Sequence, residues 1–166
     1  MHAPPPEEPR VFLHVGRWLI DQQIRVPLIY AEDLDKGWVL IEDFGDARMR
    51  DWLDENPQGE EEAYAGAIDA LVDLHRKPAG PFPPYDEPTY MREAQLFTEW
   101  YCPALGLDVD AAGFDAAWRE VLAPLTANQQ PGVTVLRDYH AENIMLLRPD
   151  QGASEQGVID FQDALV

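Results

Sequence analysis

The chain has 166 residues, 46% of them hydrophobic, which is enough for a domain with a core and too apolar for a disordered chain. Its 12 Lys and Arg residues against 31 Asp and Glu residues give a formal charge of −19. This charge repels phosphate backbones and argues against nucleic-acid binding. It also means that a nucleotide bound here needs a metal ion or well-placed cations.

The N-terminal part of the chain predicts one helix and two strands. Apolar residues recur at helical spacing from Val11 to Leu19, and Pro9 stands where such a helix can begin. A β-biased run that contains Pro27 favours an edge strand or an approach to one. In order, we expect extended chain over 3–9, a helix over 9–22, an edge strand over 24–31, a turn at 36–37, a buried strand over 38–41 and a linker over 42–46.

The middle of the chain predicts helices. Residues 60–77 have the clearest amphipathic pattern, which a Pro-rich stretch over 77–84 ends. The apolar stripe of this helix consists of Tyr64, Ala67, Ile68, Leu71, Val72 and Leu74. Further helices are expected to start near Met49 and to cover 88–102 and 111–126.

The C-terminal part predicts short strands over 133–136, 143–147 and 158–159, with a polar loop over 148–156. Because the helices are segregated from these strands, the fold class is α+β.

Neither the single cysteine nor the chain start indicates a secreted or membrane protein. Cys102 has no partner for an internal disulfide, and its apolar, aromatic surroundings favour a buried structural thiol. The start lacks the basic and apolar regions of a signal peptide, and no apolar run approaches the length of a membrane span. We therefore expect a cytoplasmic protein with no membrane partner.

Three polar residues near the C-terminus, Asp138, Asn143 and Asp160, stand in apolar frames that read RDYHAENIM and GVIDFQDA. In phosphoryl transfer, a carboxylate such as Asp138 orients the acceptor hydroxyl and accepts its proton. The amide oxygen of Asn143 and the carboxylate of Asp160 suit magnesium on nucleotide phosphates. Arg137 is placed to pair with a phosphate or to hold a neighbouring loop. The alternative is a surface turn rich in common turn residues.

The same two motifs resemble those of the kinase-like phosphotransferases, which include aminoglycoside phosphotransferases and choline kinases. They are most similar to those of the bacterial anomeric N-acetylmuramate and N-acetylglucosamine kinases. The resemblance implies a protein-kinase-like fold, a catalytic role for Asp138 and magnesium ligation by Asn143 and Asp160. The chain departs from the pattern at Leu136, where many relatives have a His that is usually structural.

The segment WVLIEDFGD resembles the last strand of the N-terminal lobe and the hinge of that family. By this resemblance, Glu42, Asp43 and Phe44 lie beside the adenine of ATP, with their backbone groups making its hydrogen bonds. The alternative is a plain loop between a strand and a helix.

The stretch YMREAQLFTEWYCPALGL is unusually aromatic. Sugar faces stack on Trp and Tyr rings, and Glu carboxylates accept hydrogen bonds from sugar hydroxyls. The candidate substrate contacts are Glu93, Glu99, Trp100 and Tyr101, together with Tyr139 and His140 beside the catalytic Asp. The alternative for the helical stretch is a core helix with a polar outer face.

The resemblance covers nearly the whole chain, but the chain covers only part of the family fold. No Gly-rich phosphate loop or strand lysine can be assigned, and the helices that follow the metal motif in the family are missing. The resemblance implies that residues 1–44 are the end of the N-terminal lobe with the hinge, and 45–166 an incomplete C-terminal lobe. We expect such a central fragment to bind nucleotide poorly alone.

Together these patterns predict an ATP- and Mg2+-dependent kinase of a small hydroxylated molecule, in the first place an amino sugar. One alternative is an aminoglycoside- or choline-type kinase, whose cationic acceptor suits the acidic charge. Another is a non-catalytic kinase-like module. The sequence does not indicate an oligomeric state.

Overall fold

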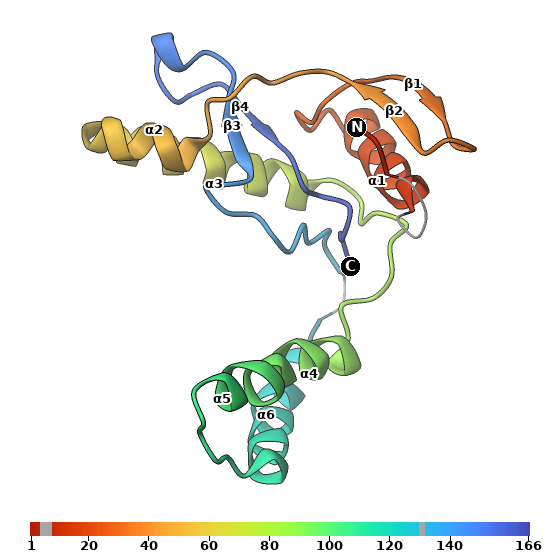
Figure 1. Cartoon of the computed structure of the whole chain (residues 1–166), viewed down its shortest axis with the longest axis vertical. Helices are drawn as coiled ribbons and strands as arrows, with labels where there is room; N and C mark the ends of the chain where they lie inside the picture. Colours follow the sequence, from red (N-terminus) through yellow and green to blue (C-terminus); the bar gives the residue numbers. More distant parts are fainter. Residues whose placement is uncertain (4–7, 130–131) are drawn as a thin grey trace. The chain divides into compact units, whose positions relative to one another are not determined.

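The computed structural model describes residues 1–3, 8–129 and 132–166 (Figure 1). They form two compact units, one made of Met1–Phe82 with Val133–Val166 and the other of Pro83–Gly132. The first unit contains all four strands, β1 to β4, of the described residues, and both units contain helices. The mixture of helices and strands predicted from the sequence is therefore confirmed. The extended chain predicted over 3–9 falls partly on residues 4–7, outside the described residues.

Helix α1 spans Pro9–Asp21 and confirms the first predicted helix. It begins at a proline because the proline ring fixes a helical φ and the first N–H needs no partner. The Glu8 side chain caps this end by accepting a hydrogen bond from the Arg10 N–H at 2.9 Å. Leu13, Val15 and Leu19 form its buried face.

Strands β1 (Ile29–Asp33) and β2 (Trp38–Ile41) pair as an antiparallel hairpin, which Figure 1 shows beside α1. The predicted turn is present, with Gly37 at φ 67°. The prediction that 38–41 is buried is wrong: Trp38 and Leu40 are 51% and 60% exposed, and only Val39 is buried. A two-stranded hairpin covers one face only, so alternate side chains point outward.

Helices α2 (Met49–Glu55) and α3 (Glu60–Arg76) pack with the hairpin of β3 (Ile144–Leu146) and β4 (Gln156–Val158). A 3-10 turn, Pro57–Gly59, connects the two helices, and another, Pro149–Gln151, lies in the predicted polar loop. The backbone N–H of Leu146 donates to the Ala47 carbonyl at 2.8 Å, which ties β3 to the start of α2. The shared core consists of Met49, Ala63, Ala67, Ile144, Leu146 and Ala153.

The apolar stripe predicted on α3 is only partly buried. Ala67 and Leu74 face the core, but Tyr64, Ile68 and Val72 are at least 40% exposed in the described part of the chain. Amphipathic spacing predicts a helix and its apolar face, but it does not say what covers that face.

The strand predicted over 133–136 is not formed. Val135 makes an isolated antiparallel bridge with Leu165, through two backbone hydrogen bonds of 2.9 Å. The buried Thr134 hydroxyl accepts a hydrogen bond from the Gly80 N–H at 2.9 Å. This segment is thus fixed by single contacts on both sides rather than by a ladder.

The second unit contains α4 (Glu87–Leu96), a π-helical turn (Phe97–Tyr101), α5 (Cys102–Ala104) and α6 (Ala111–Thr126). The helices predicted over 88–102 and 111–126 are confirmed, with the π turn as a break in the first. Cys102 is 2% exposed and forms no disulfide, as expected for a structural thiol. No helix among the described residues is both long and apolar enough to cross a membrane.

The largest fully buried side chain of the described residues belongs to Phe161, immediately after Asp160. Its ring stacks on Phe12 of α1 with centroids 5.0 Å apart. A Cβ added at Gly16 would come within 3.2 Å of the ring, so α1 approaches Phe161 closely. Phe161 thereby connects α1 to the loop that carries Asp160.

We expect Phe161→Ala to lower the free energy of unfolding by about 3–5 kcal/mol, because it removes a buried ring and leaves a cavity. Denaturant unfolding measures the loss. The control Leu40→Ala truncates a side chain that is 60% exposed and should change stability by only about 0.5 kcal/mol. Equal, small losses for both variants would contradict the structure.

Candidate active site

The pairing of β3 with β4 brings Asn143 and Asp160 together. Ile144 is paired with Val158, and the Ile159 N–H donates to the Asn143 carbonyl at 3.0 Å. Asn143 therefore lies just before β3, and Asp160 just after β4, at the same end of the hairpin. The Asn143 Nδ2 and the Asp160 Oδ2 are 3.4 Å apart.

Asn143 also closes the loop that begins at Asp138. Its Nδ2 donates to the backbone carbonyl of Asp138 at 3.0 Å, and its N–H donates to the His140 carbonyl at 2.8 Å. The Asp138 N–H in turn donates to the Leu136 carbonyl at 2.8 Å. The loop is thus rigid at the backbone, while the Asp138 carboxylate stays exposed.

Two of the three non-glycine residues with positive φ in the described chain lie in this loop pair: Arg137 at 62° and Asp160 at 58°. The left-handed region costs free energy for residues with a Cβ, and such residues concentrate at functional sites. Here the neighbours that hold the backbone are buried: Leu136 before Arg137, and Phe161 after Asp160. Neither position is a glycine, so no residue type there predicts a left-handed conformation.

Gln162 contacts the Asp160 carboxylate, a role that was not predicted from the sequence. Its Nε2 donates to the Asp160 Oδ1 at 2.7 Å, which fixes one oxygen of the carboxylate. The DFQDA motif contains the hint for this contact, because the amide of Gln162 follows Asp160 by two residues. Gln162 therefore orients Asp160.

The donor set of this site fits magnesium. Mg2+ prefers carboxylate and amide oxygens at about 2.1 Å, so two ligands of one ion lie within about 4 Å of each other. The head groups of Asn143 and Asp160 are in contact, Nδ2 to Oδ2 at 3.4 Å, so the two side chains reach the same place. The Nδ2 bond to the Asp138 carbonyl leaves the amide oxygen of Asn143 as its ligand atom.

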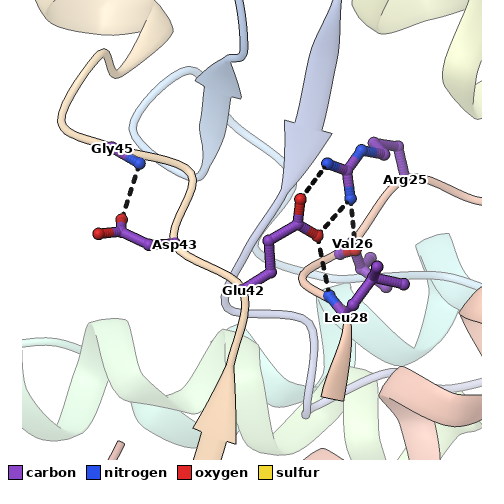
Figure 2. Close-up of polar contacts among 6 residues, drawn as sticks. All are labelled: Arg25, Val26, Leu28, Glu42, Asp43 and Gly45. Carbon is purple, nitrogen blue, oxygen red and sulfur yellow. Dashed lines mark hydrogen bonds and ion pairs between the residues drawn. The ribbon is translucent and has the colours of Figure 1, made fainter. Parts of the chain in front are cut away.

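The segment 42–44 follows β2 and is tied to residues 25–28 (Figure 2). The Glu42 carboxylate makes two hydrogen bonds with the Arg25 guanidinium, at 2.7 and 2.6 Å, and accepts a third from the Leu28 N–H at 3.1 Å. The Asp43 carboxylate accepts a hydrogen bond from the Gly45 N–H at 2.8 Å. These side chains are engaged within the protein, so a ligand at 42–44 would be met by backbone groups.

Of those backbone groups, the Glu42 N–H donates to the Leu28 carbonyl at 2.8 Å. Within the described residues, the Glu42 carbonyl and the Phe44 N–H have no such partner. An acceptor and a donor two residues apart thus remain for a ligand such as adenine. The adenine contact itself stays a prediction.

The Arg25–Glu42 pair also sets the ionisation of both groups. Hydrogen bonds from the guanidinium hold the pKa of Glu42 below its ordinary value, and the same bonds raise the pKa of Arg25. Because the folded-state pKa of Glu42 is lowered, the pair stabilises the fold above pH about 4.5, the ordinary value. That contribution is lost as the pH falls through the lowered pKa.

A model of the phosphotransferase enzyme family matches residues 1–166 of the chain. The chain belongs to this family. Among curated proteins it is similar to the N-acetylmuramate/N-acetylglucosamine kinases of Pseudomonas aeruginosa and Pseudomonas putida. It is 39% identical to each over 170 residues, which is 99% of this chain and 48% of the relative.

A protein with the same printed name in Caulobacter vibrioides is 32% identical over 169 residues, covering 93% of this chain and 46% of the relative. The chain thus spans about half the length of the curated relatives it matches. This agrees with the prediction that it corresponds to a fragment of a longer kinase.

Tyr139 is partly buried against α3. Its hydroxyl donates to the Ala67 carbonyl at 2.8 Å, and burial raises its pKa to about 12. The ring borders a shallow apolar groove with Ile68 and Leu71, and the exposed His140 borders the same groove. The hydroxyl of Tyr139 is therefore engaged with α3, and its role toward the acceptor stays a prediction.

The four remaining substrate candidates lie in the second unit, whereas Asp138, Asn143 and Asp160 come together in the first. Glu93 accepts a hydrogen bond from Tyr85, and Glu99 pairs with Arg92 at 2.7 Å. Trp100 is 71% exposed, and Tyr101 stacks on Phe97. Their role in substrate binding stays a prediction.

We expect the unfolding free energy to fall as the pH rises from about 10 to about 12, because the buried Tyr139 keeps its proton in the folded state after its unfolded counterpart has lost it. Tyr139→Phe should remove this part of the pH dependence and cost about 1 kcal/mol at neutral pH. Chemical unfolding across this pH range measures both. An unchanged slope in the variant would contradict the assignment.

Proposed function

We propose that this chain is part of an ATP- and Mg2+-dependent kinase that phosphorylates a hydroxyl of a small molecule, most consistent with an amino sugar. The observation that carries the proposal is the convergence of Asn143 and Asp160 beside the loop of Asp138. The family of the chain supports it independently.

In this proposal Asp138 is the catalytic carboxylate. Its side chain is exposed while its backbone is bonded on both sides, so it can orient an acceptor hydroxyl and take up the proton. Arg137, held in a left-handed conformation next to it, is assigned to phosphate binding or to fixing the loop.

Asn143 and Asp160 are assigned as the ligands that hold Mg2+. When bound, the ion offsets the negative charge of the nucleotide phosphates, which is needed in a chain of net charge −19. Gln162 keeps the Asp160 carboxylate in one orientation for this purpose.

Residues 42–44 are assigned to the adenine end of the nucleotide. The Glu42 carbonyl and the Phe44 N–H offer an acceptor and a donor, as argued above. We assign residues 1–44 to the end of an N-terminal lobe and 45–166 to a C-terminal lobe on the resemblance to kinases.

The acceptor is proposed from the printed names of the relatives and from the exposed rings of Trp100 and Tyr101, which offer apolar faces to a sugar. A cationic acceptor, as in aminoglycoside or choline kinases, is the second candidate because of the acidic charge. A non-catalytic module is the third.

The experiment is a panel of acceptors assayed by ADP release with the protein at the length its gene encodes. N-acetylmuramate and N-acetylglucosamine should give turnover, and aminoglycosides and choline should not. Asp138→Ala should reduce turnover by about a thousandfold or more while ATP binding is kept, because it removes the proton acceptor and not the nucleotide site.

Turnover with aminoglycosides alone would favour the second candidate. Absence of turnover with every acceptor, or full activity of Asp138→Ala, would contradict the kinase proposal. Arg50→Gln serves as the matched control. Among the described residues the exposed Arg50 side chain pairs with the exposed Asp54 on α2, so its loss should leave turnover unchanged.

A further inference from the structure

Three segments that are distant in sequence meet around Phe44: residues 25–28, residues 42–45 and strand β4. Figure 2 shows the polar contacts between the first two. Strand β4 leads directly to Asp160, whereas 42–44 is the segment proposed to bind adenine. The contacts therefore connect the two proposed ends of the nucleotide site.

Arg25 and Glu42 form the polar part of this connection. Four hydrogen bonds join Glu42 to residues 25–28: two from the guanidinium, one from the Leu28 N–H to the carboxylate, and one from the Glu42 N–H to the Leu28 carbonyl. A bidentate Arg–carboxylate pair fixes direction as well as distance. Because 42% of the Arg25 side chain is exposed, its contribution to stability alone is small.

Phe44 forms the apolar part. The Arg25 Cζ lies 4.6 Å from the centroid of its ring, within the range of a cation–π contact. A Cβ added at Gly157 of β4 would come within 2.4 Å of the ring, so the ring packs against this glycine. A side chain at this place in β4 would displace the Phe44 ring.

Arg25 also contacts β4 through its backbone. Its carbonyl accepts a hydrogen bond from the Val158 N–H at 2.8 Å. The next N–H in the chain, that of Ile159, donates to Asn143 at 3.0 Å. The end of β4 is thus held by Arg25 and by the Asn143 loop at consecutive residues, directly before Asp160.

We propose that Arg25 and Glu42, acting through Phe44 and Gly157, are positioning residues that couple the 42–44 segment to the strand end that carries Asp160. The inference rests on the proposed function. Phosphoryl transfer depends on placing the nucleotide accurately, so a fixed link between the adenine and the metal ends of the site has a direct use. The side chains of Arg25 and Glu42 are not among the groups assigned to ATP or to the metal, since the adenine contacts are assigned to backbone groups of 42–44.

The test compares Glu42→Gln, Arg25→Gln and the double variant with Arg50→Gln, which breaks an exposed ion pair of similar length, 2.7 Å, on α2. All are made in the protein at the length its gene encodes. The Kd of Mg2+·ATP is measured by calorimetry, and the KM of the acceptor by ADP release. Hydrogen exchange of the Val158 amide is followed in parallel.

We expect the Kd of Mg2+·ATP to rise on the order of tenfold in either single variant, as for other residues that support metal ligands. The double variant should be no worse than the single ones, because both remove the same bonds. Exchange at Val158 should become faster, and the acceptor KM should stay unchanged. Arg25→Lys, which keeps the charge, should recover part of the affinity.

Gly157→Ala is an independent variant, since it leaves the ion pair intact but displaces the Phe44 ring. It should raise the same Kd. If these variants only lower the amount of active protein, with the Kd unchanged, the contacts are merely structural and the inference is overturned. If no acceptor is phosphorylated, the proposed function fails, but the Kd still decides whether the coupling exists.

Discussion

The antiparallel pairing of β3 with β4 is the contact on which the rest of the site depends. Each strand has three residues, so the ladder is short, and only its exact register places Asn143 beside Asp160. A shift by one residue would turn the side chains of β4 to the opposite face. Two features fix this register. All three residues of β3 are buried, and the Val158 N–H of β4 donates to the Arg25 carbonyl.

The positions around this pairing combine rigid backbone with exposed polar groups. Leu136 and Phe161 are buried, while Asp138, two residues after Leu136, and Asp160, directly before Phe161, are exposed. Burial of the neighbours supplies the free energy that keeps Arg137 and Asp160 in left-handed conformations. The backbone is therefore held in place while both carboxylates stay exposed to solvent, which suits the binding of a metal or a phosphate.

Much of the fold follows from local patterns. Helices α1, α3 and α6 could be predicted from periodicity and from their terminal residues, and so could the hairpin at Gly37. The strand predicted over 133–136 failed because apolar composition does not reveal whether a partner strand exists. The burial of 38–41 failed for a related reason, since it depends on what covers the second face of a hairpin.

The residues of the candidate site likewise include some that were predicted from the sequence and some that were missed. The motifs predict Asp138, Asn143 and Asp160 as site residues, and the structure brings Asn143 and Asp160 together beside the loop of Asp138. Gln162 was missed although its contact is local, with Asp160 two residues earlier in the chain. Arg25 and Gly157 were missed because their contacts join segments far apart in the chain, such as the Phe44 ring against Gly157. For Glu42, the sequence pointed to the segment, whereas the structure shows that its side chain is bound to Arg25.

The most direct test of the central claim is a titration with Mn2+·ATP followed by NMR, with Mn2+ in place of Mg2+. A paramagnetic ion broadens the resonances of nearby groups, so the signals of Asn143 and Asp160 should disappear together and before those of the rest of the chain. In Asp160→Asn the broadening should require much more metal. Broadening that spares both residues, or that is unchanged in the variant, would contradict a shared metal site.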